Sequence, residues 1–396
     1  MKMLDSQSFD QSSSQAELAH FVANNAANTR RSLLLVGGGT ARSHAGPADI
    51  CEVRLDRLNR VIDFPARDMT ITVEAGIRIA ELNRILATEN QRLPIDIPQA
   101  AQATLGGVIA TNWSGSRRFG CGTMRDYVIG ISAIDATGRR FSAGGRVVKN
   151  VAGYDLCKLL VGSRGTLAII SQVTLKLRPM AETSALVTLT FDSLSQVDAV
   201  LNRLLTSATR PMVLDVLQTV GRRQLVVGFE GAKREVDWQI ETLLAECRPF
   251  ETRATESFVG DAAEGLGNTL RDFSINSKSS VTFKASLPPS RTCELLRLAT
   301  EAGIDSQAHA GNGIVIGHLP ARASTADQAL AAIKPLGELA RSCGGHLTVL
   351  RAPNEWPRLD VVADSWAASL AWTQRLKRQL DPHSLLNPGV MAFGPA

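Results

Sequence analysis

"LLLVGGGTARS", residues 33–43, is an apolar run that ends in three glycines and a threonine. Residues without a Cβ let several backbone N–H groups converge on one anion, so such a loop after a strand favours a phosphate. The loop lacks both the GxGxxG spacing of a Rossmann turn and the Gly-Lys-Ser/Thr of a P-loop. Taken alone, the stretch fits either an anion-binding loop or a plain tight turn.

A second glycine-rich segment, "PQAAQATLGGVIATNWSGSRRFGCG", spans residues 98–122 and holds five glycines. Its apolar "LGGVIA" core has helical spacing and indicates the start of a helix, whose N-terminal dipole would favour a phosphate. The segment is predicted to bind an anion or a ring, and the alternative is an ordinary flexible loop.

A third segment, "GGRVVKNVAGYDLCKLLVGSRGTLAIISQVTLKL", spans residues 144–177. It begins with a loop that contains an amide, a cation and a phenol. A helix, a tight turn and a strand are expected to follow this loop. The three segments in this order resemble the FAD-binding domain shared by vanillyl-alcohol oxidase, p-cresol methylhydroxylase and the D-2-hydroxyacid dehydrogenases. Within that group the pattern is most similar to the FAD-binding subunits of bacterial glycolate oxidases. The resemblance is strong over residues 17–180, and "LKRQLDPHSLLNPGVM" fits the family's usual D-P-x-x-x-x-N-P-G ending.

The resemblance implies an α+β fold with a two-part p-cresol methylhydroxylase-type FAD-binding domain and a ferredoxin-like α+β cap domain. The strand and helix patterns after Glu182 agree, because they form a split βαβ series whose helices should lie on one face of an antiparallel sheet. The expected boundaries are a flexible tail (1–15), the FAD-binding domain (16–180), the cap or substrate domain (181–355) and a C-terminal helix and tail returning to the FAD domain (356–396).

The cofactor implied by the resemblance is FAD, held by residues carried over from the family pattern. The first loop would give its N–H groups to the pyrophosphate, and the second segment would continue along the pyrophosphate to the isoalloxazine ring. Within the third segment, Gly165 and the strand to Ile170 would face adenine and ribose through the main chain. These residues are Val36, Gly37, Gly38, Gly39, Thr40 and Ala41; Pro98, Leu105, Gly106, Gly107, Thr111, Asn112, Ser114 and Gly115; and Gly165 and Ile170.

Several members of this superfamily attach flavin covalently through a histidine beside the first loop. Thr40 occupies that place here and His44 lies four residues further on, so the FAD is expected to be non-covalent. Cys121, near the second segment, is interpreted as a packed spectator thiol. The six cysteines are scattered, without a CxxC pair or a Cys/His cluster, so the chain is not expected to carry its own iron–sulfur relay.

The substrate side rests on weaker motifs. "QAHAGNGIVIGHL" resembles the H-G-D-G-N-x-H stretch of related hydroxyacid dehydrogenases at His309, Gly311 and Gly313, but Val315 replaces the second histidine. "CGGHLTVLRAP" keeps His346 without the Glu-His pair that completes a metal site in catalytic relatives. No metal is therefore expected. The alternative for both histidines is a hydrogen-bonded interior side chain.

Oxidation of a 2-hydroxy acid needs a cation for the carboxylate and a base near neutral pKa. Arg351 or Lys149 is the candidate cation, and His309 or His346 the candidate base. Tyr154 could hydrogen-bond near the ring.

Composition narrows the remaining classes. The formal charge of +5 is spread along the chain without a basic run, which argues against nucleic acid. No apolar stretch approaches the length of about 18 residues that a membrane span needs. The polar N-terminal segment lacks an apolar h-region, which favours a cytoplasmic location, with peripheral association at the inner membrane face through partners.

These observations predict an FAD-dependent oxidoreductase of glyoxylate metabolism. The chain would be the FAD-binding subunit of a glycolate-oxidase-type 2-hydroxyacid dehydrogenase complex, working with a second FAD subunit and an iron–sulfur subunit. Two alternatives stay open: a self-sufficient FAD oxidase or dehydrogenase of another hydroxy acid or alcohol, and an FAD-binding structural subunit without substrate chemistry of its own.

Overall fold

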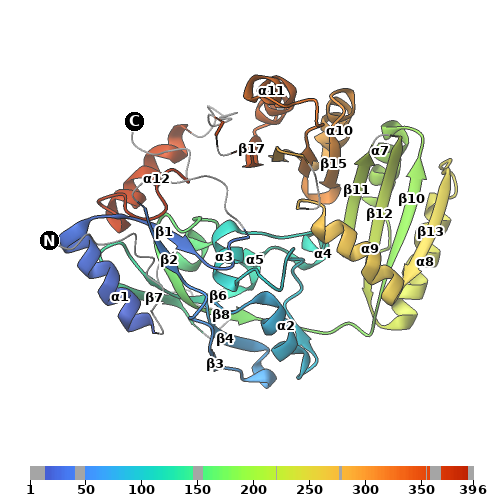
Figure 1. The fold of residues 1–396 in the computed structure, drawn as a ribbon. Helices are drawn as coiled ribbons and strands as arrows, with labels where there is room; N and C mark the ends of the chain where they lie inside the picture. The colour runs from blue at the N-terminus through green and yellow to red at the C-terminus, as the bar shows by residue number, and fades with distance from the viewer. Residues whose placement is uncertain are drawn as a thin grey trace. The chain divides into compact units, whose positions relative to one another are not determined.

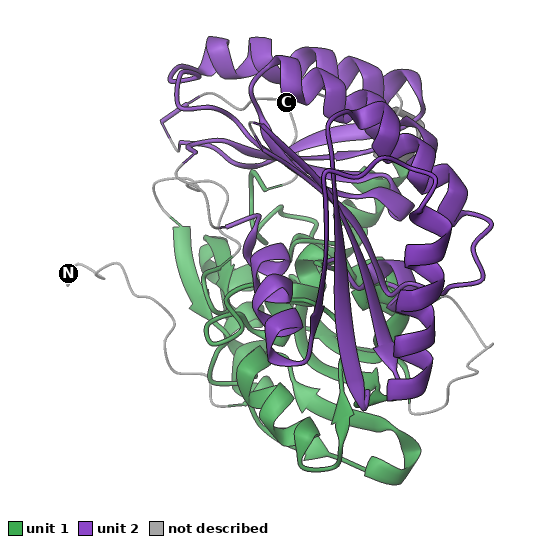
Figure 2. Ribbon diagram, turned by 90° about the vertical axis from the view of Figure 1, so that its right-hand side faces the viewer, with its two compact units in different colours: residues 1–114, 123–180, 367–396 green, residues 115–122, 181–366 purple. Residues whose placement is uncertain are grey.

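The computed structural model describes residues 14–40, 50–145, 155–219, 221–275, 279–353, 355–356 and 367–390. The chain divides into two compact units (Figure 2). Unit 1 comprises residues 1–114, 123–180 and 367–396, and unit 2 comprises residues 115–122 and 181–366. The short segment 115–122, assigned from the sequence to the first domain, thus groups with unit 2.

Unit 1 is built on a five-stranded antiparallel sheet and a separate parallel pair of strands (Figure 1). The sheet has the order β3 (Val61–Asp63), β4 (Thr70–Glu74), β8 (Ile169–Lys176), β6 (Val128–Ile134) and β7 (Arg140–Gly144). The parallel pair is β1 (Ser32–Val36) with β2 (Ile50–Arg54), and a small sheet joins β5 (Gln91–Arg92) to β9 (Arg178–Pro179). The helices are α1 (Gln15–Asn24), α2 (Ile79–Ala87), α3 (Leu105–Thr111), α5 (Met124–Tyr127), α6 (Leu156–Leu160) and α12 (Ala367–Leu380).

Helix α1 shows how local sequence sets these elements. The Ser14 side chain accepts a hydrogen bond from Glu17 N and so caps the first turn. The apolar side chains of α1 then pack in one cluster with Leu33 of β1, Val53 of β2 and Ile134 of β6. The amphipathic helix thereby ties the parallel strand pair to the larger sheet.

Unit 2 is built on one eight-stranded sheet in which every pairing is antiparallel. The order is β13 (Ala254–Val259), β10 (Thr183–Phe191), β12 (Arg222–Gly231), β11 (Val213–Thr219), β15 (Asp305–His309), β16 (Ile314–His318), β14 (Thr282–Ser286) and β17 (His346–Arg351). The helices are α4 (Arg118–Cys121), α7 (Leu194–Leu204), α8 (Lys233–Cys247), α9 (Asp261–Asp272), α10 (Thr292–Glu301) and α11 (Ala326–Ser342). The predicted α+β class is confirmed.

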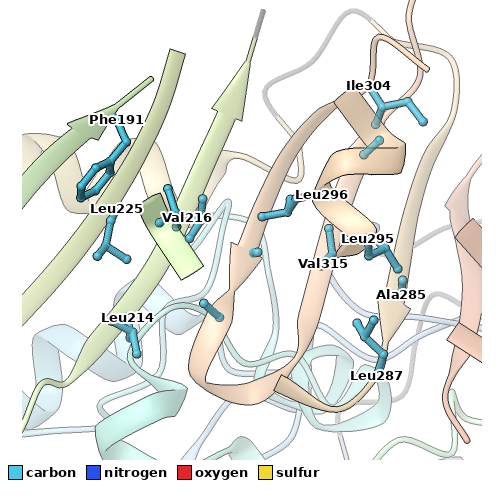
Figure 3. Close-up of a cluster of buried hydrophobic side chains, with 14 of the residues drawn as sticks. Phe191, Leu214, Val216, Leu225, Ala285, Leu287, Leu295, Leu296, Ile304 and Val315 are labelled. Atoms are coloured by element: carbon cyan, nitrogen blue, oxygen red, sulfur yellow. The ribbon is translucent and has the colours of Figure 1, made fainter. Parts of the chain in front are cut away.

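The main core of unit 2 lies on one face of this sheet. Successive side chains of a strand point to opposite faces, and alternate residues such as Val216 and Val315 enter a core that includes Leu295 of α10 (Figure 3). Helices α7, α8 and α11 contribute side chains to the same core. Helix α9 departs from the expected one-sided arrangement, because it packs with Leu186 and Val226 on the other face. Among the described residues, no helix is both long and apolar enough to cross a membrane.

Replacing Phe229 with Ala should destabilise unit 2. Phe229, on β12, is 1% exposed in this core, and removing a buried phenyl group costs about 3–5 kcal/mol through lost burial and the cavity left behind. Urea denaturation measures the loss. The matched control is Leu205→Ala, whose side chain is 80% exposed and should change stability by no more than about 0.5 kcal/mol. Equal losses in the two variants would contradict this core assignment.

Candidate functional site

The glycine loop after β1 packs directly on the residues that precede α3. A Cβ on Gly37 would lie 2.1 Å from Oγ1 of Thr104, and one on Gly38 would lie 1.7 Å from the backbone oxygen of Gln102. Both distances are far inside van der Waals contact, so only glycine permits this approach. The first two segments singled out in the sequence are thus in contact.

The same loop presents backbone donors. Among the hydrogen bonds of the described residues, none uses the N–H groups of Gly37, Gly38 or Gly39. Gly37 and Gly38 are partly exposed, and Gly39 is exposed with φ of 73° and no atom within 4 Å of the place where its Cβ would be. Unpaired, accessible N–H groups at a strand end fit a pyrophosphate.

The start of α3 is occupied by the protein itself. Leu105 N donates to the carbonyl of Ile77 at 2.9 Å, and Gly106 N donates to the carbonyl of Ala75 at 2.6 Å. The Thr104 side chain caps the helix by accepting from Gly107 N at 3.4 Å. These three N–H groups are therefore already used, whereas no described hydrogen bond uses those of Gly37, Gly38 and Gly39.

The far end of α3 carries an unsatisfied polar atom. Asn112 ends the helix in the left-handed conformation, with φ of 50°. Its Oδ1 is buried and has no hydrogen-bond partner among the described residues. A buried acceptor without a donor is costly, so this atom fits a donor supplied by a bound group.

The remaining predicted residues of the second segment have structural contacts. Thr111 Oγ1 donates to a carbonyl of its own helix at 3.0 Å, and Ser114 Oγ accepts from Met124 N at 3.0 Å. Pro98 lies half-buried in the turn before α3, and Gly115 begins the segment that belongs to unit 2.

The third segment is fastened to the other two through Asn387. Arg164 N donates to the carbonyl of Ala110 in α3 at 2.7 Å. Asn387 Oδ1 accepts from Leu35 N at 2.7 Å, while its Nδ2 donates to the carbonyl of Arg164 at 2.7 Å. A Cβ on Gly165 would lie 2.6 Å from that Nδ2. One amide side chain therefore joins the strand of the first loop to the third segment.

The D-P-x-x-x-x-N-P-G ending holds this asparagine in place. The buried Asp381 carboxylate accepts from Leu385 N and Leu386 N, each at 2.8 Å. Lys377 Nζ donates both to Asp381 and to the carbonyl of Thr166, the latter at 2.6 Å. Burial lowers the pKa of the Lys377 ammonium. The C-terminal motif is thus a turn that is held by hydrogen bonds to the carboxylate of its own aspartate.

Val36 and Ile170 belong to the interior of unit 1. Val36 is 4% exposed, and its carbonyl accepts from Leu55 N at 2.8 Å. Ile170 is 5% exposed and pairs with Ala133 within the five-stranded sheet. Any contribution to a ligand would come from their main chains.

Unit 2 contains a buried cluster around His309. His309 Nδ1 lies 2.8 Å from Asp215 Oδ1, and the two residues face each other across β15 and β11. Asp215 Oδ2 accepts from Ser116 Oγ at 2.6 Å and from Gln307 Nε2 at 2.8 Å. All four residues are at most 3% exposed. The sequence alone indicated His309 but none of its three partners.

The two histidines proposed from the sequence lie in one row across the sheet. The register runs from His309 to Ile314, then to Ser286, then to His346. Three strand spacings of about 4.8 Å separate the histidines by about 14 Å, too far to share one metal ion. The described residues contain no group of three or more His, Cys, Asp or Glu side chains placed to bind a metal.

The cation near His346 is Lys284, which no sequence motif indicates. Burial, and then the charge of Lys284, lower the pKa of His346. Arg351 instead pairs with Thr282, and its Nη2 donates to the carbonyl of Ser279 at 2.9 Å. Side chains alternate between the two faces of a strand, and this alternation in "TFKAS" is the signal that could have placed Lys284 on the same sheet face as His309 and His346.

Some sequence-based candidates cannot be located. Ala41, His44, Lys149 and Tyr154 lie outside the described residues. Cys121 is buried, with its sulfur 3.8 Å from that of Met212, as expected for a packed thiol.

Comparison with known proteins identifies the class. The family described as "FAD binding domain" matches residues 9–144. The chain is thus a flavoprotein oxidoreductase with an FAD-binding domain of the p-cresol methylhydroxylase type, and the prediction of FAD as cofactor is confirmed. The described loop donors and the orphaned Asn112 oxygen fit that cofactor.

Relatives extend the similarity over both units. Glycolate oxidase subunit GlcE of Escherichia coli (strain K12) is 26% identical over 373 residues, covering 93% of this chain and 95% of that protein. Glycolate oxidase subunit GlcD of Bacillus subtilis (strain 168) is 23% identical, covering 89% and 81%. D-lactate dehydrogenase of Archaeoglobus fulgidus is 28% identical, covering 89% and 84%. The predicted resemblance to glycolate oxidase subunits is confirmed.

A solved structure supports the fold. Alkyldihydroxyacetonephosphate synthase superposes with a TM-score of 0.69 at 17% identity, covering 96% of this chain and 75% of that one. At this identity the likeness concerns the fold alone.

Replacing Gly38 with Ala should weaken FAD binding at least about tenfold, or about 1.4 kcal/mol, because the new Cβ forces the loop away from Gln102. Titration of the apoprotein with FAD, followed by flavin fluorescence, measures the affinity. Gly265→Ala is the control, since that glycine lies in α9 with open space around it. Equal affinities in the two variants would refute the packing argument.

Replacing Lys284 with Met should raise the pKa of His346. The wild-type imidazole should titrate below its ordinary value of about 6.5, because both burial and the neighbouring cation disfavour the charged form. Without the cation, burial remains to lower the pKa, so the midpoint of the His346 titration should move up. NMR titration of the His346 ring measures it, and an unchanged or lower midpoint would contradict the assignment.

Proposed function

We propose that this chain is the FAD-binding subunit of a glycolate-oxidase-type complex that oxidises a small 2-hydroxy acid of the glycolate class. The observation that carries the proposal is the similarity to GlcE of Escherichia coli, which spans nearly the full length of both proteins. The other relatives named as glycolate oxidase and D-lactate dehydrogenase support the same substrate class.

The cofactor is held by unit 1. The N–H groups of Gly37, Gly38 and Gly39 bind the pyrophosphate of FAD, and Asn112 Oδ1 accepts a hydrogen bond from the bound cofactor. Thr40 stands at the position where a histidine attaches flavin in some relatives, so the FAD is dissociable. Bound FAD supplies an acceptor for the hydride that leaves the substrate carbon.

The acid–base chemistry belongs to unit 2. His309 is the base that takes the hydroxyl proton, because a buried carboxylate orients its ring. His346, which lies beside Lys284, is the second candidate. Lys284 replaces Arg351 as the cation for the substrate carboxylate, since Arg351 lies five residues further along its strand from His346. The role of Tyr154 stays a prediction.

The partners are a second FAD subunit and an iron–sulfur subunit, towards which electrons leave the flavin. The relatives are named as separate subunits of glycolate oxidase, which supports a multi-chain complex. The complex is expected in the cytoplasm, in peripheral contact with the inner membrane through the partner subunits.

One purification tests this proposal. The isolated chain should show visible flavin absorbance, and acid precipitation should release the flavin into the supernatant. Glycolate and D-lactate are then offered with an artificial acceptor, first to the chain alone and then with its partner chains. Colourless protein that binds no added FAD would refute flavin binding. Turnover without partners would reject the subunit assignment in favour of a self-sufficient enzyme, and a complex inactive on both acids would reject the substrate class.

Replacing His309 with Gln should slow flavin reduction by substrate about 10²–10⁴-fold in the assembled complex, because the general base is lost. Stopped-flow absorbance of the flavin measures the rate. The FAD content should not change, since His309 belongs to unit 2, whereas the residues proposed to bind FAD belong to unit 1. His20→Gln, on the exposed side of α1, is the control. A rate equal to the control's would assign the proton to another group, and the same variant at His346 tests that candidate.

A further inference from the structure

We propose that Asp215 is a positioning residue that holds His309 in the tautomer with its proton on Nδ1. The unprotonated Nε2 is then the atom able to accept a proton. The use of that atom in catalysis rests on the function proposed above, whereas the tautomer itself does not.

The hydrogen bonds of the carboxylate define where the proton lies. Asp215 is 0% exposed, and its Oδ1 lies 2.8 Å from His309 Nδ1. An ionised carboxylate only accepts hydrogen bonds. A hydrogen bond between these atoms therefore requires a proton on Nδ1, and the neutral ring then has a lone pair on Nε2.

The second carboxylate oxygen keeps Asp215 in this orientation. Oδ2 accepts from Ser116 Oγ at 2.6 Å and from Gln307 Nε2 at 2.8 Å. The ion pairs of the described residues give Asp215 no lysine or arginine, so these neutral donors and His309 compensate its buried charge. A carboxylate bonded at both oxygens cannot rotate without breaking a contact.

The surrounding chain fixes the cluster further. Ser116 belongs to segment 115–122, whose Gly120 N donates to the carbonyl of Met212 at 3.1 Å. Phe119 of the same segment packs on Gly311, where a Cβ would lie 2.2 Å from the Phe119 ring. Segment 115–122 thus packs against residues that lie close in sequence to both Asp215 and His309.

The Nε2 end of the ring differs from the Nδ1 end. No hydrogen bond of the described residues uses His309 Nε2, and this atom is not among the buried polar atoms that lack a partner. The ring is thus held at Nδ1, while no described hydrogen bond engages Nε2, the atom that a general base would use.

The test is the tautomer of His309 in the wild type and in Asp215→Asn. With ¹⁵N-labelled histidine the six imidazole rings each give a pair of ring-nitrogen signals, and His309→Gln identifies the pair from His309. The wild type should show a protonated Nδ1 and an unprotonated Nε2. In Asp215→Asn the amide oxygen should stay on the donors Ser116 and Gln307, which turns the NH₂ group towards His309. Nδ1 must then accept, so the proton should move to Nε2.

The kinetic readout is flavin reduction in the complex. Asp215→Asn should slow it about 10²–10⁴-fold, as does loss of the base itself, without changing FAD affinity. Asp237→Asn, on α8 with a side chain 48% exposed, is the matched control and should change neither the tautomer nor the rate.

The outcomes separate this inference from the proposed function. A wild-type His309 with its proton on Nε2 overturns the inference and needs no variant to fold. An unchanged tautomer in a folded Asp215→Asn protein overturns it as well. If the tautomer inverts and only His309→Gln slows flavin reduction, positioning by Asp215 has no catalytic role. If the tautomer inverts and neither variant slows it, His309 is not the base, and the assignment of Asp215 as the group that orients the ring stands.

Discussion

The contact that the cofactor-binding unit depends on is the seating of two glycines on the turn before α3. Gly37 and Gly38 approach Thr104 and Gln102 so closely that no side chain fits between them. This approach leaves the loop's N–H groups as the available anion donors, because the amides at the start of α3 bond to residues of the same unit. The turn before α3 thus supports the loop, and the loop carries the unpaired backbone N–H groups.

In unit 2 the corresponding constraint is the alternation of side chains across an antiparallel sheet. One face is filled by apolar residues under four helices, while the other face carries His309, Asp215, Lys284 and His346. Strand pairing sets the spacing of these groups. It places an aspartate directly opposite one histidine and a lysine beside the other, so the two histidines have different electrostatic surroundings.

Sequence patterns predicted the local elements well and the long-range contacts poorly. The glycine loop, α1, α3 and most strands follow from periodicity and turn residues. Helix α11 contains Pro335, which normally interrupts a helix, and β15 has the mostly polar sequence DSQAH, so neither element stands out in the sequence. The residues of the Asp215–His309 pair are 94 positions apart, and those of the Asn387–Leu35 bond are 352 positions apart. The sheet of unit 2 brings the first pair together, and the C-terminal turn brings the second pair together. Arg351 was a candidate because of its charge alone, which does not specify its place along the strand.

The bond between Asn387 and Leu35 has a consequence for the order in which the protein can be made. Residues 181–366 are synthesised between the two partners, so the ribosome completes the whole of unit 2 before the turn at Asp381–Asn387 emerges. Until then, the strand that leads into the glycine loop lacks the amide that links it to Arg164. The nascent chain can therefore form the Asn387 bonds that join β1 to Arg164 only after residues 181–366 have been synthesised.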